Sequence, residues 1–252
     1  MNDKQGPGKA GDALFQSTHW SLVLTACDSQ MPGSRSALAQ LCQIYWYPLY
    51  AHVRRRGYDP SSAQDLTQGF FQHLLEQKSL RHVDSRKGKF RSFLLGSLQK
   101  YLATEYRRDC TIKRGGLLSF VSLDAKAAES RYQLEPVDDS GLTAEQSFDA
   151  RWAVELLNEL MRRLEESYAD EAQKFEVLKV FLVPTGPAPS YENAAAKLGL
   201  SVPAVKTSIH RLRHQYKTLL RREVARTVSD PTEVDEEIRY LCEVVVAAGG
   251  RI

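Results

Sequence analysis

The sequence predicts an all-α protein built from two small helical domains joined by a linker. Almost every periodic segment repeats its apolar residues at three- and four-residue steps, and no alternating pair of strands is visible. A chain of 252 residues is long enough for one large domain or two small ones. A hydrophobic content of 42% is typical of a soluble globular protein, and no apolar run is long enough to span a membrane.

The first domain is expected over residues 14–110, after a disordered tail at 1–13 that lacks the apolar core of a signal peptide. A short helix is expected at 18–26. A long helical segment follows at 34–56, in which Pro48 predicts a kink or a break. Asp59 and Pro60 are typical of a helix start, and that helix should run to about Gln77. A basic loop at 85–89 then leads to a helix over 90–108.

Residues 111–142 are expected to form a linker, because they contain Gly and Pro and have weak periodicity. A short helix is expected within it, around 125–132. Thr143 and Gln146 form a capping box that opens the second domain, expected over 143–228. A helix near 171–182 and a proline-rich loop at 183–189 come next. Residues 229–252 form an acidic extension. Its apolar spacing favours a helix packed on the second domain, with a regulatory segment as the alternative.

Residues 190–226 have the pattern of a helix-turn-helix. Ser190 can cap the first helix, Gly199 fits the left-handed turn, and Leu200 is expected to fill the core beneath it. The second helix carries a basic face opposite an apolar stripe, and Glu223 is its only acidic residue after Pro203. Such a helix can enter the major groove of DNA, whereas an ordinary surface helix mixes charges of both signs. The predicted basic face comprises Lys206, Thr207, His210, Arg213, His214, Lys217 and Arg221.

Two helices of the first domain have polar faces. Asp65, Gln68 and Gln72 lie opposite the apolar side of the helix at 60–77, and the residues alone favour a solvated surface there. Lys89 and Arg91 add positive charge at the start of the helix at 90–108. Basic groups interleaved with aromatics suit single-stranded nucleic acid. The outward positions of that helix are Gln99, Lys100, Ala103 and Arg107.

No set of residues predicts catalysis, a metal site or a cofactor, so the chain is not expected to be an enzyme. The four cysteines are far apart and form no CxxC motif, which favours reduced thiols in a cytoplasm. His210 and His214 share a helix face but have no third ligand nearby. A metal-dependent nuclease would also need clustered carboxylates. That function remains the weakest alternative.

Three segments give the chain a resemblance to the bacterial extracytoplasmic-function (ECF) sigma factors. YWYPLYAHVRRRGYDPSSAQDLTQGFF at 45–71 and FRSFLLGSLQKYLATEYRRD at 90–109 resemble region two of that family. YENAAAKLGLSVPAVKTSIHRLRHQYKTLL at 191–220 resembles region four. The order, the spacing and the intervening linker also match, and the resemblance covers about residues 14–227.

The resemblance implies a protein that binds core RNA polymerase and directs promoter recognition and DNA-templated transcription initiation. Asp65 and Gln68, with Gln72 on the same face, would dock the polymerase. The residues implied at the downstream promoter element are Lys89, Arg91, Gln99, Lys100, Ala103 and Arg107. Those implied at the upstream element are Lys206, Thr207, His210, Arg211, Arg213, His214 and Lys217. An anti-sigma factor or another regulatory protein is a further candidate partner.

The chain also departs from the family pattern. Lys100 and Thr104 stand where many relatives carry Asn and Asp, and the loop at 183–189 is longer and richer in proline than usual. A stand-alone helix-turn-helix regulator is the alternative function. Such proteins usually dimerise on two half-sites, and the sequence shows no obvious dimer helix.

Overall fold

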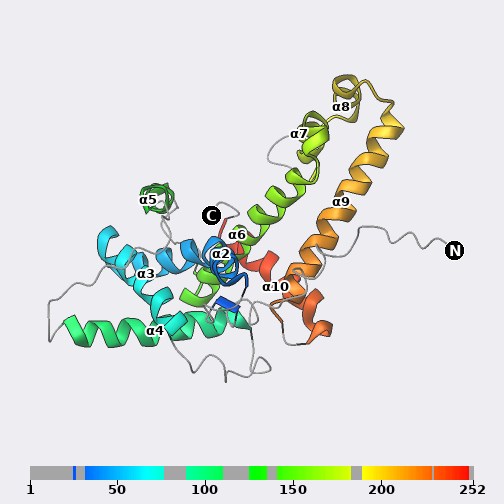
Figure 1. Ribbon diagram of the computed structural model, residues 1–252. Coiled ribbons are helices and arrows are strands. Elements are labelled where there is room, and N and C mark those ends of the chain that lie inside the picture. Colours follow the sequence, from blue (N-terminus) through cyan, green and yellow to red (C-terminus); the bar gives the residue numbers. More distant parts are fainter. Residues whose placement is uncertain are drawn as a thin grey trace. The chain divides into compact units, whose positions relative to one another are not determined.

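The computed structural model describes residues 25–26, 32–76, 89–109, 125–134, 141–182, 189–228 and 230–249. Every regular element within these ranges is a helix, which confirms the predicted all-α class (Figure 1). The tail at 1–13, most of the helix expected at 18–26, the basic loop before Lys89, most of the linker and the loop at 183–188 lie outside the described residues.

The chain divides into two compact units. Unit 1 comprises Met1–Ala153 together with Ala225–Ile252, and unit 2 comprises Val154–Val224. The division falls inside helix α6 (Ala144–Glu166) and at the end of helix α9 (Val202–Ala225). The start of α6 and the C-terminal extension therefore both group with unit 1.

Unit 1 is built around helices α2 (Ser34–Arg55), α3 (Pro60–Glu76), α4 (Phe90–Asp109), α5 (Ala125–Leu134) and α10 (Val234–Ala247), with the first part of α6 and the short helix η5 (Pro231–Glu233). Buried aromatic rings join three of these helices. Tyr45 of α2 stacks on Trp152 of α6 with centroids 6.2 Å apart, and meets Phe90 of α4 edge-on at 5.4 Å. These rings bury large apolar areas in preferred geometries, so they anchor the unit's core.

Helix α2 runs without interruption through Pro48, so the break that the sequence allowed is wrong. Tyr45, Leu49, Tyr50 and Val53 on either side of the proline are all at most 1% exposed. A proline inside a helix removes one hydrogen bond and crowds the preceding turn. Tertiary packing of these apolar side chains outweighs that cost, because most helical stability in proteins comes from packing.

The predicted helix starts of unit 1 are confirmed. Asp59 Oδ1 accepts hydrogen bonds from the backbone N–H groups of Ser61 and Ser62 at 3.0 and 3.1 Å. At the start of α6, the Gln146 N–H donates to Thr143 Oγ1 at 3.1 Å, and the Thr143 N–H donates to Gln146 Oε1 at 3.0 Å. The second pair is the reciprocal capping box.

The short helix expected near 125–132 is present as α5, and Glu129 ties it to α2. Arg54 Nε and Nη2 each donate to a Glu129 oxygen at 2.8 Å, and Tyr50 Oη donates to Oε2 at 2.5 Å. Hydrogen bonds from the Arg54 guanidinium hold the pKa of Glu129 at about 2, below the ordinary 4.5. The ionised carboxylate is therefore the form that fastens α5 to unit 1.

We expect Glu129→Gln to lower the free energy of unfolding by about 1–2 kcal/mol at neutral pH, because the amide cannot form the charged fork with Arg54. A depressed carboxyl pKa contributes stability that is present above pH 4.5 and is lost as the pH falls towards 2. Urea unfolding at several pH values checks this. The wild type should lose stability through that window, and Glu129→Gln should lose less. Parallel curves for the two proteins would contradict the assignment.

Unit 2 contains the end of α6, helix η4 (Ala169–Glu171), helix α7 (Ala172–Lys179), helix α8 (Tyr191–Leu198) and most of α9. Its core brings together one side of each α-helix. The fully buried members are Leu164, Phe175, Leu178, Phe181, Ala194, Ala195, Val205, Ile209 and Leu212. The small residues Ala194 and Ala195 supply the packing side of α8 that the sequence predicted.

The turn between α8 and α9 has the expected geometry. Ser190 Oγ accepts from the Asn193 N–H at 3.1 Å, and Gly199 has a φ of 62° in the left-handed region that favours glycine. The Leu200 N–H donates to the Ala195 carbonyl at 3.0 Å. The expectation that the Leu200 side chain fills the core is wrong, since it is 40% exposed. The turn is closed by its backbone instead.

Candidate nucleic-acid interface

Helix α9 buries one side and presents the opposite side to solvent. Val205, Ile209 and Leu212 are at most 2% exposed. All seven residues predicted to meet the upstream element are exposed, and they lie along the exposed side and its flanks. These are Lys206, Thr207, His210, Arg211, Arg213, His214 and Lys217. The contacts that these residues make divide them into flanks and a centre.

Arg213 lies on one flank and is engaged within unit 2. Its Nη2 and Nε donate to the Phe181 carbonyl, just beyond α7, at 2.9 and 3.3 Å. The Phe181 ring in turn stacks on Tyr191 of α8, with centroids 5.2 Å apart, and Lys206 Nζ lies 5.2 Å from the Tyr191 ring centroid. This flank therefore fixes α7 and α8 against α9, which the helical spacing could not show.

We expect Arg213→Ala to lower the free energy of unfolding by about 1 kcal/mol without any DNA present, because the Phe181 carbonyl loses its charged donor. Urea unfolding measures this, with Lys217→Ala on the same helix as the control that should change little. An Arg213→Ala protein of unchanged stability that binds DNA poorly would show that the guanidinium serves the DNA instead.

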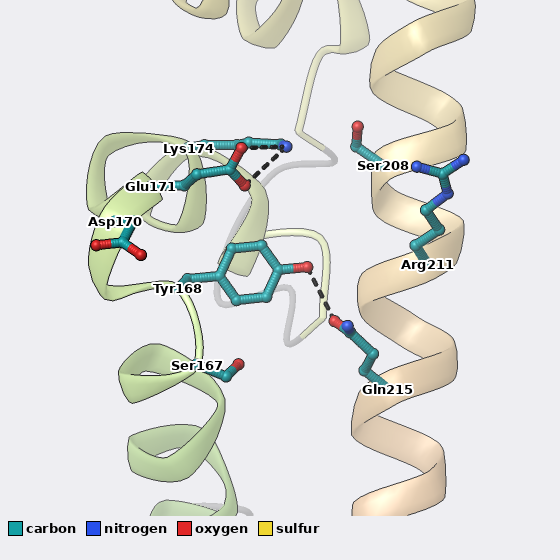
Figure 2. A pocket seen from close by; sticks show the side chains of 8 residues that line it. All are labelled: Ser167, Tyr168, Asp170, Glu171, Lys174, Ser208, Arg211 and Gln215. Atoms are coloured by element: carbon teal, nitrogen blue, oxygen red, sulfur yellow. Dashed lines mark hydrogen bonds and ion pairs between the residues drawn. The ribbon is translucent and has the colours of Figure 1, made fainter. Parts of the chain in front are cut away.

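The other flank borders a polar pocket of about 530 Å³ within unit 2 (Figure 2). Tyr168 Oη donates across it to Gln215 Oε1 at 2.9 Å, and on the side of η4 and α7 Lys174 Nζ pairs with Glu171 Oε2 at 2.9 Å. Arg211 also lines the pocket. The remaining residues that line the pocket are Ser167, Asp170 and Ser208. Both signs of charge are present, so the pocket is not a preformed anion site.

The centre of the exposed side holds Thr207, His210, His214 and Lys217. Thr207 is exposed, and its Oγ1 donates to the Pro203 carbonyl at 3.0 Å. Hydroxyl, imidazole and ammonium groups can all meet base edges or phosphates in a major groove. Within the described ranges, no group of three or more His, Cys, Asp or Glu residues could hold a metal ion.

Helix α4 buries one side and exposes four of its predicted DNA contacts. Leu94, Leu95, Leu98 and Leu102 are at most 3% exposed. The exposed predicted residues are Gln99, Lys100, Ala103 and Arg107. Tyr106 beside them is 66% exposed, so an aromatic ring accompanies the cations on this surface. That combination suits unstacked bases.

Arg91 is the exception, and its burial does not fit the predicted DNA contact. Its side chain is 1% exposed, and its Nε donates to Asp149 Oδ1 of α6 at 2.7 Å, while Nη1 pairs with Glu237 of α10. The guanidinium also lies 5.2 Å from the Trp152 ring centroid and 5.7 Å from that of Tyr240. Two carboxylates and two rings therefore hold Arg91 inside unit 1.

Glu237 also forms an ion pair with Lys89, the other predicted DNA contact at the start of α4. The Lys89 Nζ lies 2.5 Å from Glu237 Oε2 and 5.1 Å from the Tyr240 ring centroid, and its side chain is 36% exposed. The sequence analysis did not identify Glu237, Tyr240 or Asp149 as partners. The C-terminal extension groups with unit 1 and not with unit 2, although its Tyr240 does contact Asp149, which lies within the expected second domain. One signal was available, because Arg91 precedes Leu94 and Leu98 at helical steps on the inward side of α4.

The three residues predicted to dock the polymerase share one side of α3. Asp65 is exposed, and Gln68 and Gln72 are half-buried, while Ala63 and Phe70 are fully buried on the other side. Gly69 allows α4 to approach closely, because an added Cβ would lie 2.5 Å from Tyr101 Oη. Of the three predicted docking residues, Asp65 is the exposed one, and it is the only one that carries a charge.

The fold and the exposed surfaces define a helical DNA-binding protein of the helix-turn-helix class. The ECF sigma factor family matches residues 28–222, which is more than half of the chain, and the chain belongs to that family. No curated protein and no solved structure matches this chain. Among the helices of the described ranges, none is long and apolar enough to cross a membrane.

Proposed function

We propose that this sigma factor binds core RNA polymerase and directs it to promoters by contacting DNA with two separate helices. The exposed side of α9 reads the upstream element, and the exposed side of α4 meets the melted downstream element. The side of α3 that carries Asp65 docks the polymerase. The protein then acts in the cytoplasm, where the polymerase and its template are found.

The observation that carries the proposal is the arrangement of α8 and α9. A capped helix, a left-handed glycine turn and a second helix with an exposed basic side fit entry into a major groove. Thr207, His210, His214 and Lys217 are the proposed base-facing centre, and Lys206, Arg211 and Arg213 flank it. The downstream contacts proposed on α4 are Gln99, Lys100, Ala103 and Arg107, without Arg91.

The test is reconstitution with purified core polymerase. The full chain should bind the core enzyme in a capture assay, and sequencing of RNA 5′ ends made on genomic DNA should reveal a shared promoter sequence. Failure to bind core polymerase, combined with tight binding to a palindrome by the protein alone, would support the stand-alone regulator instead.

Charge reversal on α3 gives the sharpest prediction for the polymerase surface. We expect Asp65→Arg to weaken core binding about tenfold or more, since it places a cation where the partner meets a carboxylate. Glu243→Arg is the matched control, because Glu243 is an exposed acid on α10 of the same unit. Capture at several core concentrations, with circular dichroism of each variant, measures both effects. Equal losses for the two variants would mean that net charge alone matters.

A further inference from the structure

The C-terminal helix α10 places a buried carboxylate on the positively charged start of α4. Glu237 is 2% exposed, yet it lies in an apolar stripe with Val234, Leu241 and Val244. A charged residue in such a stripe is costly unless it is paired. Glu237 is paired with cations at the start of α4, and so the acidic extension neutralises that end of the helix.

The two cations that Glu237 contacts are held differently. Arg91 is buried and has a second carboxylate partner, Asp149, from α6. Lys89 has a partly exposed side chain, and its ion pair with Glu237 Oε2 lacks hydrogen-bond geometry. Tyr240 covers both cations with its ring and donates its hydroxyl to Asp149 Oδ2 at 2.9 Å. Lys89 is therefore the cation that can exchange its partner.

We propose that Glu237 competes with DNA phosphate for Lys89, so that the C-terminal helix lowers the affinity of the α4 surface for DNA in the free protein. The proposal rests on the proposed function, because it assumes that α4 meets promoter DNA. An ammonium paired with a carboxylate releases no counterion from DNA. While this pair is in place, the Lys89 ammonium makes no phosphate contact, so the wild-type protein binds DNA without using it.

The first test compares Glu237→Gln with Glu236→Gln. Both changes remove one negative charge from α10, but Glu236 is exposed whereas Glu237 is buried. Binding of a short fluorescein-labelled single-stranded oligonucleotide to the full chain is measured by anisotropy across a salt series. Glu237→Gln should bind about three- to tenfold more tightly at low salt, and its slope of log affinity against log salt should steepen by about 0.7, one extra phosphate contact on a single strand.

Glu236→Gln should change neither quantity by a comparable amount. Equal gains in the two variants would overturn the proposal, because net charge would then explain them. The proposal would also be overturned if circular dichroism shows that Glu237→Gln is folded but its affinity for the oligonucleotide does not increase, or if it does not bind detectably.

Lys89→Gln provides a second test that leaves the buried pair of Arg91 and Glu237 in place. In the wild-type background it should leave oligonucleotide binding unchanged, because the ammonium is already occupied. In the Glu237→Gln background it should abolish the gain. A loss of equal size in both backgrounds would show that Lys89 is always available to DNA and would overturn the proposal. Core polymerase capture, run in parallel, reports separately on the proposed function.

Discussion

Replacing Arg91 with alanine should lower the free energy of unfolding by about 3–5 kcal/mol, the cost expected when one partner of a buried ion pair is removed. The guanidinium, which is 1% exposed, lies between Asp149 and Glu237. Both carboxylates are at most 4% exposed, so their charges would remain in a low-dielectric interior. The alanine would also remove the cation from the Trp152 and Tyr240 rings.

Urea unfolding of the full chain measures this effect, with Lys100→Ala on the exposed side of α4 as the matched control. The control should stay within about 0.5 kcal/mol of the wild type. A triple variant, Arg91→Met with Asp149→Asn and Glu237→Gln, should recover part of the loss, because it leaves no buried charge unpaired. An Arg91→Ala protein as stable as the control would contradict the buried network.

The features that could be predicted from the sequence are those fixed by neighbouring residues. Asp59, Ser190 and the Thr143–Gln146 box each bond to a backbone group two or three positions away. Gly199 adopts its left-handed conformation because it ends helix α8, and this cause is also local. Such interactions leave a spacing signature because the partner lies within one helical turn. The exposed sides of α4 and α9 could be predicted for the same reason.

The features that could not be predicted depend on partners distant in sequence. Arg91 and Glu237 are 146 positions apart, and no residue near either one in the sequence indicates that the two side chains pair. Arg213 sits at an exposed helical position, but its guanidinium meets a carbonyl 32 positions away. Helical periodicity shows which side of a helix is apolar, but not whether a long cation at its margin bonds to protein or stays in solvent.

The second large effect that we expect is a loss of stability of unit 1 at low pH, caused by protonation of His52. His52 is 5% exposed, and its Nε2 has no hydrogen-bond partner within the described part of the chain. Its ring meets Phe148 edge-on at 6.5 Å. Burial, with the nearby cations Arg56 and Arg151 as smaller causes, lowers the pKa of His52 from 6.5 to about 4.

The sign of the effect follows from which state binds the proton more readily. Because the unfolded chain takes up a proton near pH 6.5 and the folded protein resists it until about pH 4, stability is highest above 6.5 and falls as the pH drops between these values. The loss should reach about 3 kcal/mol over the whole window, with about 2 kcal/mol of it between pH 7 and 5. Glu129 titrates below pH 4.5, so the upper part of the window isolates the histidine.

His52→Leu should remove this pH dependence while keeping an apolar side chain of similar size in the same place. Urea unfolding of both proteins at pH 7 and pH 5 gives the comparison. The variant should lose about 2 kcal/mol less than the wild type on acidification. If both proteins lose the same amount, the imidazole accepts its proton in the folded state as readily as in the unfolded chain. The buried, cation-flanked environment that the structure gives His52 would then be incorrect.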